Sequence, residues 1–120
     1  MAASDWPESR FRVLVVDDDP DQTDSLLALL GLWGYEARGA TSAVRALDVV
    51  RAWSPNVVLL DLVLPGMNGW KLGEILRARD ESKEITLIAL TGDSSQASRH
   101  RAFEFGFSYF LLKDLLGRPG

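Results

Sequence analysis

The stretch "VLVVDDDPD", Val13 to Asp21, indicates the fold more strongly than any other part of the chain. Four apolar residues run directly into three aspartates, and a proline follows. A short apolar run that ends in turn-forming residues is typical of a strand buried on both faces. Asp19 and Pro20 are residue types favoured at the N-cap and first turn of a helix. The aspartates thus stand between a buried strand and a helix, and because like charges repel, a counter-charge is expected beside them.

The rest of the chain repeats this strand-and-helix pattern. We predict strands, the second of them a more polar edge strand, over residues 12–16, 35–40, 56–60, 85–90 and 109–112. We predict helices over residues 21–34, 42–53, 70–79 and 94–105. Gly31 or Gly34 should end the first helix, Thr41 should cap the second, and Gly106 should end the last. The alternation predicts an α/β fold, with a parallel sheet covered by helices on both faces.

Composition narrows the classes of protein to consider. The chain has 120 residues, and we expect one domain over residues 11–116 with tails over 1–10 and 117–120. A net charge of −4 argues against direct nucleic-acid binding, which needs clustered Lys and Arg. The absence of cysteine excludes disulfides and thiolate catalysis. No apolar run approaches the roughly 20 residues of a membrane span, and no signal peptide is visible, so we expect a cytoplasmic protein.

Polar residues follow the central strands at the point where each strand ends. Asp17 and Asp18 follow the first strand, and Asp61, Thr91 and Lys113 follow the third, fourth and fifth. In parallel sheets, ligands bind beyond the carboxyl ends of the strands, so these groups are expected to converge. Clustered carboxylates are suitable ligands for Mg²⁺, which prefers oxygen. A carboxylate can also act as a nucleophile and form an aspartyl phosphate, whose oxygens a cation, a hydroxyl and an ammonium would stabilise.

At these residues the chain resembles the receiver (CheY-like) domains of bacterial two-component signalling. The resemblance covers about Phe11 to Leu115 and is carried by "VLVVDDDPD", "VVLLDLVLPGMNGW", "LIALTGD" and "FSYFLLKD", in the order and spacing of the family. It implies a flavodoxin-like doubly wound sheet of five parallel strands in the order 2-1-3-4-5. It also implies a phosphoacceptor domain that a histidine kinase or histidine phosphotransfer protein phosphorylates. Such a domain catalyses only its own phosphorylation and dephosphorylation and is not a turnover enzyme.

The resemblance also implies roles for individual metal ligands. Asp61 corresponds to the phosphoacceptor and is a ligand of Mg²⁺. Asp18 corresponds to a direct Mg²⁺ ligand, and Asp17 to a residue that acts on the metal mainly through water. The backbone carbonyl of Val63, two residues past Asp61, corresponds to a further ligand.

Other residues correspond to the switch that responds to phosphorylation. Thr91 corresponds to the hydroxyl that moves toward the phosphoryl group, and Lys113 to the cation that pairs with it. Phe110 stands at the position of the switch aromatic residue. Gly92 is small, as in the family, and leaves room for the phosphoryl group.

The chain departs from the family pattern near its C-terminus. Lys113 is followed by Asp114, where the family usually has a proline. Seven residues follow Lys113, and they include Gly117, Pro119 and Gly120. We therefore expect either that the family's fifth helix is absent or that the sequence was cut from a longer protein. The strands that this helix would cover then need another partner. The segment around Trp6 or a second copy of the chain could provide it, and of the two we expect a homodimer.

Two other functions are compatible with parts of the sequence. The aspartate run also resembles the nucleophile motif of haloacid-dehalogenase-like phosphatases, with Asp17 as the nucleophile. Those enzymes need an acidic pair after the lysine, however, and they give Asp61 no role. The other alternative is a receiver-like module that binds partners without being phosphorylated, but all five site side chains are retained. We interpret the single histidine, His100, as a surface residue, and most of the aromatic residues near the C-terminus as packing residues. Phe110 is the candidate for a partner-binding role, with Tyr109 as a second candidate.

Overall fold

The computed structural model describes residues 11–62, 69–79, 84–92 and 96–112. Its strands are β1 (Arg12–Val16), β2 (Glu36–Ala40), β3 (Val57–Asp61), β4 (Thr86–Thr91) and β5 (Tyr109–Leu112). Its helices are α2 (Pro20–Leu32), α3 (Ala43–Trp53), α4 (Gly69–Ala78) and α5 (Gln96–Glu104). The predicted tails lie outside the described residues, and so do the residues after Leu112, where a fifth helix would begin.

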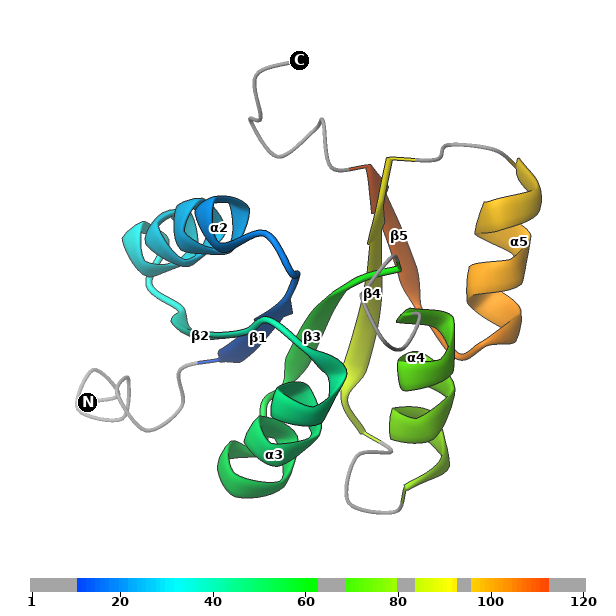
Figure 1. The fold of residues 1–120 in the computed structure, drawn as a ribbon, viewed down its shortest axis with the longest axis horizontal. Coiled ribbons are helices and arrows are strands. Elements are labelled where there is room, and N and C mark those ends of the chain that lie inside the picture. The colour runs from blue at the N-terminus through cyan, green and yellow to red at the C-terminus, as the bar shows by residue number, and fades with distance from the viewer. Residues whose placement is uncertain (1–10, 63–68, 80–83, 93–95, 113–120) are drawn as a thin grey trace, which may run out of the picture.

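The five strands form one parallel sheet in the order β2-β1-β3-β4-β5 (Figure 1). This topology confirms the predicted α/β class and strand order. The order places β1, β3 and β4 in the middle of the sheet, so their carboxyl ends lie beside one another. Strand β2 is at an edge, as its polar sequence predicted.

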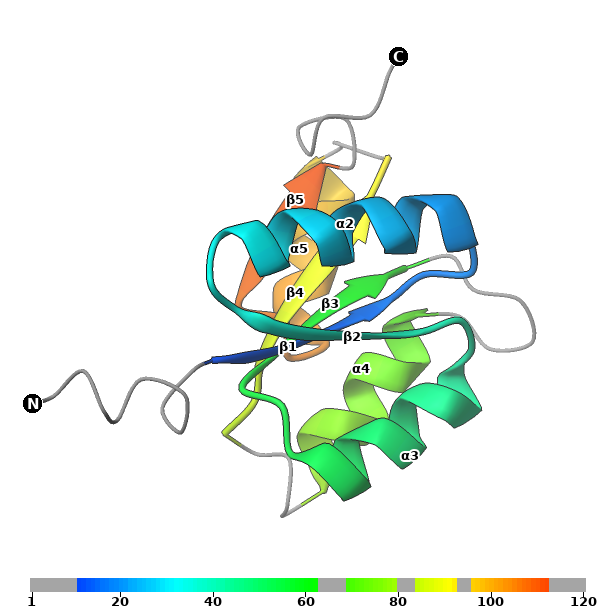
Figure 2. The ribbon, with the colours of Figure 1, turned by 90° about the vertical axis from the view of Figure 1, so that its left-hand side faces the viewer.

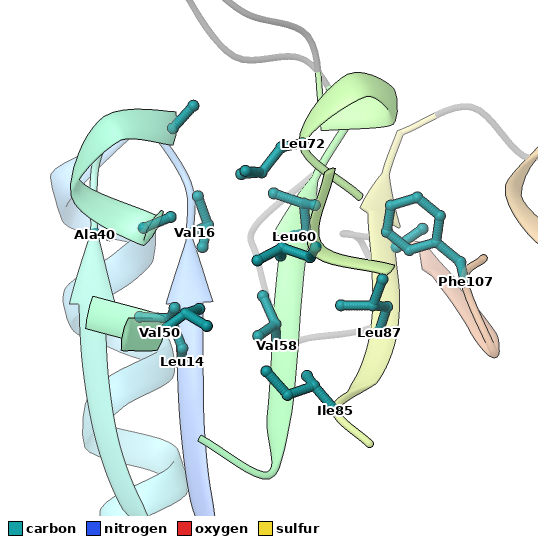
Figure 3. Packing of buried hydrophobic residues seen from close by; sticks show 14 of the residues in the cluster. Leu14, Val16, Ala40, Val50, Val58, Leu60, Leu72, Ile85, Leu87 and Phe107 are labelled. Atoms are coloured by element: carbon teal, nitrogen blue, oxygen red, sulfur yellow. The ribbon is translucent and has the colours of Figure 1, made fainter. Parts of the chain in front are cut away.

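Helices cover both faces of the sheet because alternate residues of the central strands point to opposite sides. Val13 and Val15 pack with Leu26 and Leu30 of α2 on one face. Helices α3 and α4 lie on the other face (Figure 2), and α5 lies on the same side as α4 (Figure 1). Core residues of these helices pack against those of β1, β3 and β4 (Figure 3). This larger cluster includes Leu14, Val16, Val50, Val58, Leu60, Leu72, Leu87, Ala102 and Phe107.

Two predicted features of the helix ends are confirmed. Asp19 caps α2, because its carboxylate accepts a hydrogen bond from the N–H of Asp21 at 3.0 Å, and Pro20 begins the helix. Gly34, with φ of 93°, follows the end of α2, whereas Gly31 lies inside the helix. The sequence predicted that either Gly31 or Gly34 would end this helix, and the structure shows that it is Gly34.

The predicted cap of α3 was wrong by one residue. Ser42, and not Thr41, is the N-cap: its backbone is extended, and its hydroxyl accepts a hydrogen bond from the N–H of Arg45 at 3.2 Å. The reason is geometric, because the cap must directly precede the first helical residue, which is Ala43. Gly106, with φ of 97°, follows α5 as predicted.

Candidate functional site

Three carboxylates meet at the carboxyl ends of β1 and β3. The parallel register pairs Val16 with Leu60, so Asp17 and Asp61 stand at the same level of the sheet. One carboxylate oxygen each from Asp17, Asp18 and Asp61 lies within 4.8 Å of the others. Asp17 and Asp61 are buried, at 0% and 3% exposure, while Asp18 is exposed. The structure therefore brings together the three side chains predicted to bind a metal.

Hydrogen bonds fix the turn that carries Asp17 and Asp18. The backbone N–H of Asp17 donates to the carbonyl of Ala40 in β2 at 3.1 Å. The Oδ1 atom of Asp17 accepts a hydrogen bond from the N–H of Asp19 at 3.0 Å. Asp17 thus shapes the turn as well as contributing to the acidic cluster, and one of its oxygens is engaged by the backbone.

Thr91 stands at the same edge of the sheet, on the other side of Asp61. The register pairs Asp61 with Leu90, and Thr91 is the next and last residue of β4. Thr91 is buried, at 6% exposure. Beside Gly92 the space is open, because a methyl group there would meet no other atom within 4 Å. In sheet order, Asp61 therefore has the acidic pair on one side and Thr91 on the other.

The remaining predicted site residues divide into two groups. Phe110 lies on β5, in register with Ala89, and packs half-buried against the core on the side of α3, α4 and α5. Val63 and Lys113 lie outside the described residues, so their predicted roles stay predictions. His100 is exposed, and its Nε2 atom lies 3.9 Å from the Oε1 atom of Glu104, which is also exposed, consistent with a surface residue.

The aromatic residues near the C-terminus have mixed environments. Phe107 is buried, and Phe105 and Phe110 pack partly buried against the same core. Phe103 and Tyr109 are exposed at 56% and 60%. Packing therefore explains three of these five residues and leaves two on the surface.

Gly69 lies against the backbone of the candidate site, one residue before the start of the predicted helix over residues 70–79. It is the first residue of α4, and its N–H donates to the carbonyl of Leu62 at 2.9 Å. A Cβ atom at this position would lie 2.6 Å from the Cα of Leu62 and would overlap the carbonyl oxygen of Asp61. The helix can approach the Asp61 backbone this closely only because residue 69 has no side chain. The glycine at the end of "LPGMNG" was the available signal.

The donor set fits a hard divalent cation. Carboxylate oxygens are the ligands that Mg²⁺ and Ca²⁺ prefer, and Mg²⁺ typically combines one or two protein carboxylates with water. Two of the three carboxylates are buried, where their mutual repulsion is less screened by solvent. The residues present are therefore suited to hold a divalent cation.

Mg²⁺ is expected to stabilise the folded protein. At a free concentration ten times its dissociation constant, a ligand that binds only the native state adds about 1.4 kcal/mol. For a domain of this size that corresponds to roughly 5–7 °C in Tm. Thermal melts with and without Mg²⁺ measure the shift, and Asp18→Asn is the control because residue 18 is exposed. We expect that variant to melt no earlier than the wild type without metal and to respond less to Mg²⁺. A wild-type Tm that does not change with Mg²⁺ would argue against the site.

The fold and the site define a class of protein before any relative is considered. A doubly wound sheet that gathers acidic residues at the carboxyl ends of its central strands is an α/β domain with a candidate ligand site at its topological switch point. Within the described residues, no helix is both long enough and apolar enough to cross a bilayer.

Comparison with known families then identifies the group within that class. Residues 13–117 match the response regulator receiver domain family, and the chain belongs to that family. A DNA-binding response regulator, MtrA of Mycolicibacterium smegmatis, is 35% identical over 104 residues, which cover 87% of this chain. The matched region is only 44% of that relative, so this chain corresponds to less than half of the longer protein.

Solved structures show the same fold. A putative response regulator from Chloroflexus aurantiacus superposes with a TM-score of 0.82 at 28% identity, over 90% of this chain and 92% of that one. The BeF3-activated N-terminal receiver domain of RstA from Klebsiella pneumoniae gives a TM-score of 0.79 at 29% identity, covering 90% and 87% of the two chains. Both similarities extend over nearly the whole described domain.

Proposed function

We propose that this chain is the phosphoacceptor of a two-component phosphorelay and takes a phosphoryl group onto Asp61. The observation that carries the proposal is the place of Asp61 in the sheet. It lies on β3, between the acidic pair that follows β1 and the hydroxyl of Thr91 on β4. A nucleophile needs groups around it that stabilise the transferred phosphoryl oxygens, and this position has candidates on both sides.

The proposed reaction uses the carboxylate of Asp61 as the nucleophile. An oxygen of Asp61 attacks the phosphorus of a phosphohistidine donor and forms a P–O bond as the P–N bond breaks. The electron pair of the P–N bond goes to the imidazole nitrogen, which takes up a proton from solvent. When bound, Mg²⁺ would offset the negative charge of the carboxylates and of the phosphoryl oxygens. Asp17 and Asp18 would hold it, together with Asp61 and, as the resemblance implies, the carbonyl of Val63. Thr91 and Lys113 would stabilise the product.

The neighbourhood of Phe110 supports the proposed switch. Ala89 lies two residues before Thr91 on β4, so both side chains point to the same face of the sheet. Phe110 is in register with Ala89 and packs on that face. A movement of Thr91 toward a phosphoryl group would therefore change the packing on the face where Phe110 lies.

The donor would be a histidine kinase or a histidine phosphotransfer protein in the cytoplasm. The chain would then promote only its own phosphorylation and hydrolysis, without turnover of an external substrate. The name of the M. smegmatis relative describes it as DNA-binding, but the region matched by this chain is only 44% of that protein. The net charge of −4 supports the expectation that this chain makes no direct nucleic-acid contact.

A homodimer through the α2 face of the sheet is also proposed. Within the described residues, α2 is the helix on this face, and Val57, Ile88 and Leu111 there are only partly buried. A second copy would cover these side chains by a two-fold contact. Light scattering over a dilution series tests this, and a monomer at the highest concentration would contradict it.

The phosphatase alternative is less consistent with the site. It requires Asp17 as the nucleophile, but the Oδ1 atom of Asp17 accepts a hydrogen bond from the backbone N–H of Asp19, which fixes this carboxylate in the turn. Strand β3 also separates β1 from β4, so Asp17 is farther along the sheet from Thr91 than Asp61 is. The third interpretation, a binding module that is never phosphorylated, does not explain why three carboxylates are clustered at this edge of the sheet.

Incubation with a small phosphodonor, such as acetyl phosphate, tests the proposal directly. We expect one phosphoryl group per chain when Mg²⁺ is present and almost none when it is chelated, measured by the mass of the intact protein. Labelling that is independent of Mg²⁺, or no labelling at all, would contradict the proposed reaction.

A further inference from the structure

Thr23 connects helix α2 to the turn that carries the acidic residues. Thr23 is buried, at 4% exposure, and its hydroxyl lies 2.9 Å from the carbonyl oxygen of Asp19 and 3.2 Å from that of Asp17. A bond to the carbonyl four residues earlier is ordinary for a threonine in a helix. The contact with Asp17 is different, because Asp17 lies outside the helix and follows β1. The hydroxyl therefore joins two elements.

The two carbonyls that the hydroxyl contacts stand on either side of Asp18. Because Asp18 is exposed, packing does not fix its carboxylate, and the direction of the side chain depends on the backbone. A donor between the carbonyls of Asp17 and Asp19 restrains the orientation of both flanking residues. Repulsion among the three carboxylates of the cluster would otherwise favour turning Asp18 away.

Strand β2 packs closely against Thr23 at Gly39. A Cβ atom at residue 39 would lie 2.7 Å from the Cγ2 atom of Thr23 and 3.3 Å from the Cδ1 atom of Leu27. The absence of a side chain at Gly39 is what allows the threonine methyl to occupy this space. The next residue, Ala40, accepts the backbone hydrogen bond of Asp17. The end of β2 thus supports the acidic turn at two neighbouring points.

We propose that Thr23, seated against Gly39, is a positioning residue for the divalent-cation site. Its hydroxyl holds the turn in the geometry that directs Asp18 toward Asp61, and so lowers the cost of gathering the carboxylates around a cation. This inference rests on the proposed function for the existence of the metal site. It goes beyond that function by assigning to Thr23 and Gly39 an effect on the affinity of the site for the cation.

The experiment is a titration with Mg²⁺ alone, without phosphodonor, followed by the amide NMR shifts of the acidic turn. Thr23→Val keeps the shape but removes the hydroxyl, and we expect its Kd for Mg²⁺ to rise about three- to tenfold, the value of one hydrogen bond. Thr23→Ser keeps the hydroxyl and should stay within about twofold of the wild type. Val50→Ala, in the core on the opposite face, is the control: it should lower the Tm and leave the Kd unchanged.

A second pair of variants tests the contact with Gly39. Gly39→Ala should weaken Mg²⁺ binding in the wild-type background, because the new methyl displaces Thr23. In the Thr23→Ser background the same change should cost much less, because serine lacks the Cγ2 atom that the methyl would strike. Such non-additivity is the signature of two residues in contact. This cycle also decides the question if Thr23→Val does not fold.

The outcomes separate this inference from the proposed function. If the wild type binds Mg²⁺ and Thr23→Val binds it equally well while melting earlier, Thr23 is only structural and the inference is wrong. Additive effects of Gly39→Ala and Thr23→Ser would overturn it in the same way. If the wild type does not bind Mg²⁺ at all, the metal site fails, and the proposed function fails with it.

Discussion

Asp61→Asn is expected to reduce phosphoryl transfer from a small phosphodonor by at least about a thousandfold, because an amide cannot replace the carboxylate nucleophile. Asn is nearly isosteric with Asp, so the buried position at the end of β3 remains filled. Removal of one of three neighbouring carboxylates also lowers their repulsion, and the variant should fold at least as well as the wild type without metal. The mass of the intact protein after incubation measures the transfer.

Asp18→Asn is the matched comparison for this result. It removes a carboxylate from the same cluster and leaves the nucleophile in place. We expect slower labelling that recovers in part as the Mg²⁺ concentration rises, since the lost interaction is with the metal. Asp61→Asn should not recover at any Mg²⁺ concentration. If the two variants behaved alike, Asp61 would be only a metal ligand, and its assignment as the acceptor would have to be withdrawn.

Gly69→Ala is expected to destabilise the fold by about 2–4 kcal/mol, the range of a severe backbone clash. The added methyl would overlap the carbonyl oxygen of Asp61 and lie 2.6 Å from the Cα of Leu62, and neither atom belongs to a flexible side chain. Helix α4 or the end of β3 must therefore shift. We also expect Mg²⁺ binding and phosphoryl transfer to weaken, because the shift occurs at Asp61.

Gly31→Ala provides the control for this substitution. Gly31 lies inside α2, and a methyl there would contact nothing within 4 Å. Alanine is favoured over glycine in a helix interior by roughly 0.5–1 kcal/mol, so this variant should be more stable than the wild type. Urea denaturation of both variants measures the difference. Equal, small effects at the two positions would show that the close approach of α4 to β3 is not as described.

The sequence was sufficient to predict the strands and the polar residues at their ends. An apolar run followed by an aspartate or threonine is a local pattern, and parallel pairing then places those residues at one edge of the sheet. The structure places Asp17, Asp18 and Asp61 in one cluster, as this reasoning predicted. The strand order needed the resemblance to receiver domains, because the alternation of strands and helices is compatible with more than one order.

The features that the sequence did not predict depend on tertiary contacts. Thr41 and Ser42 are both good capping residues, and only the start of α3 at Ala43 selects Ser42. Gly69 resembles any loop glycine until α4 is packed against the backbone of Asp61. Thr23 resembles an ordinary helical residue until its hydroxyl is seen between two carbonyls of the acidic turn. The role of Gly69 and Thr23 depends on a contact with another element, and the choice of Ser42 depends on where α3 begins.

The most direct test of the central claim is to identify the residue that carries the phosphoryl group in the wild-type protein. Borohydride reduces an acyl phosphate, and peptide mass spectrometry then locates the modified aspartate. We predict modification of Asp61 alone, at no more than one site per chain. Modification of Asp17 would contradict the account and favour the phosphatase interpretation.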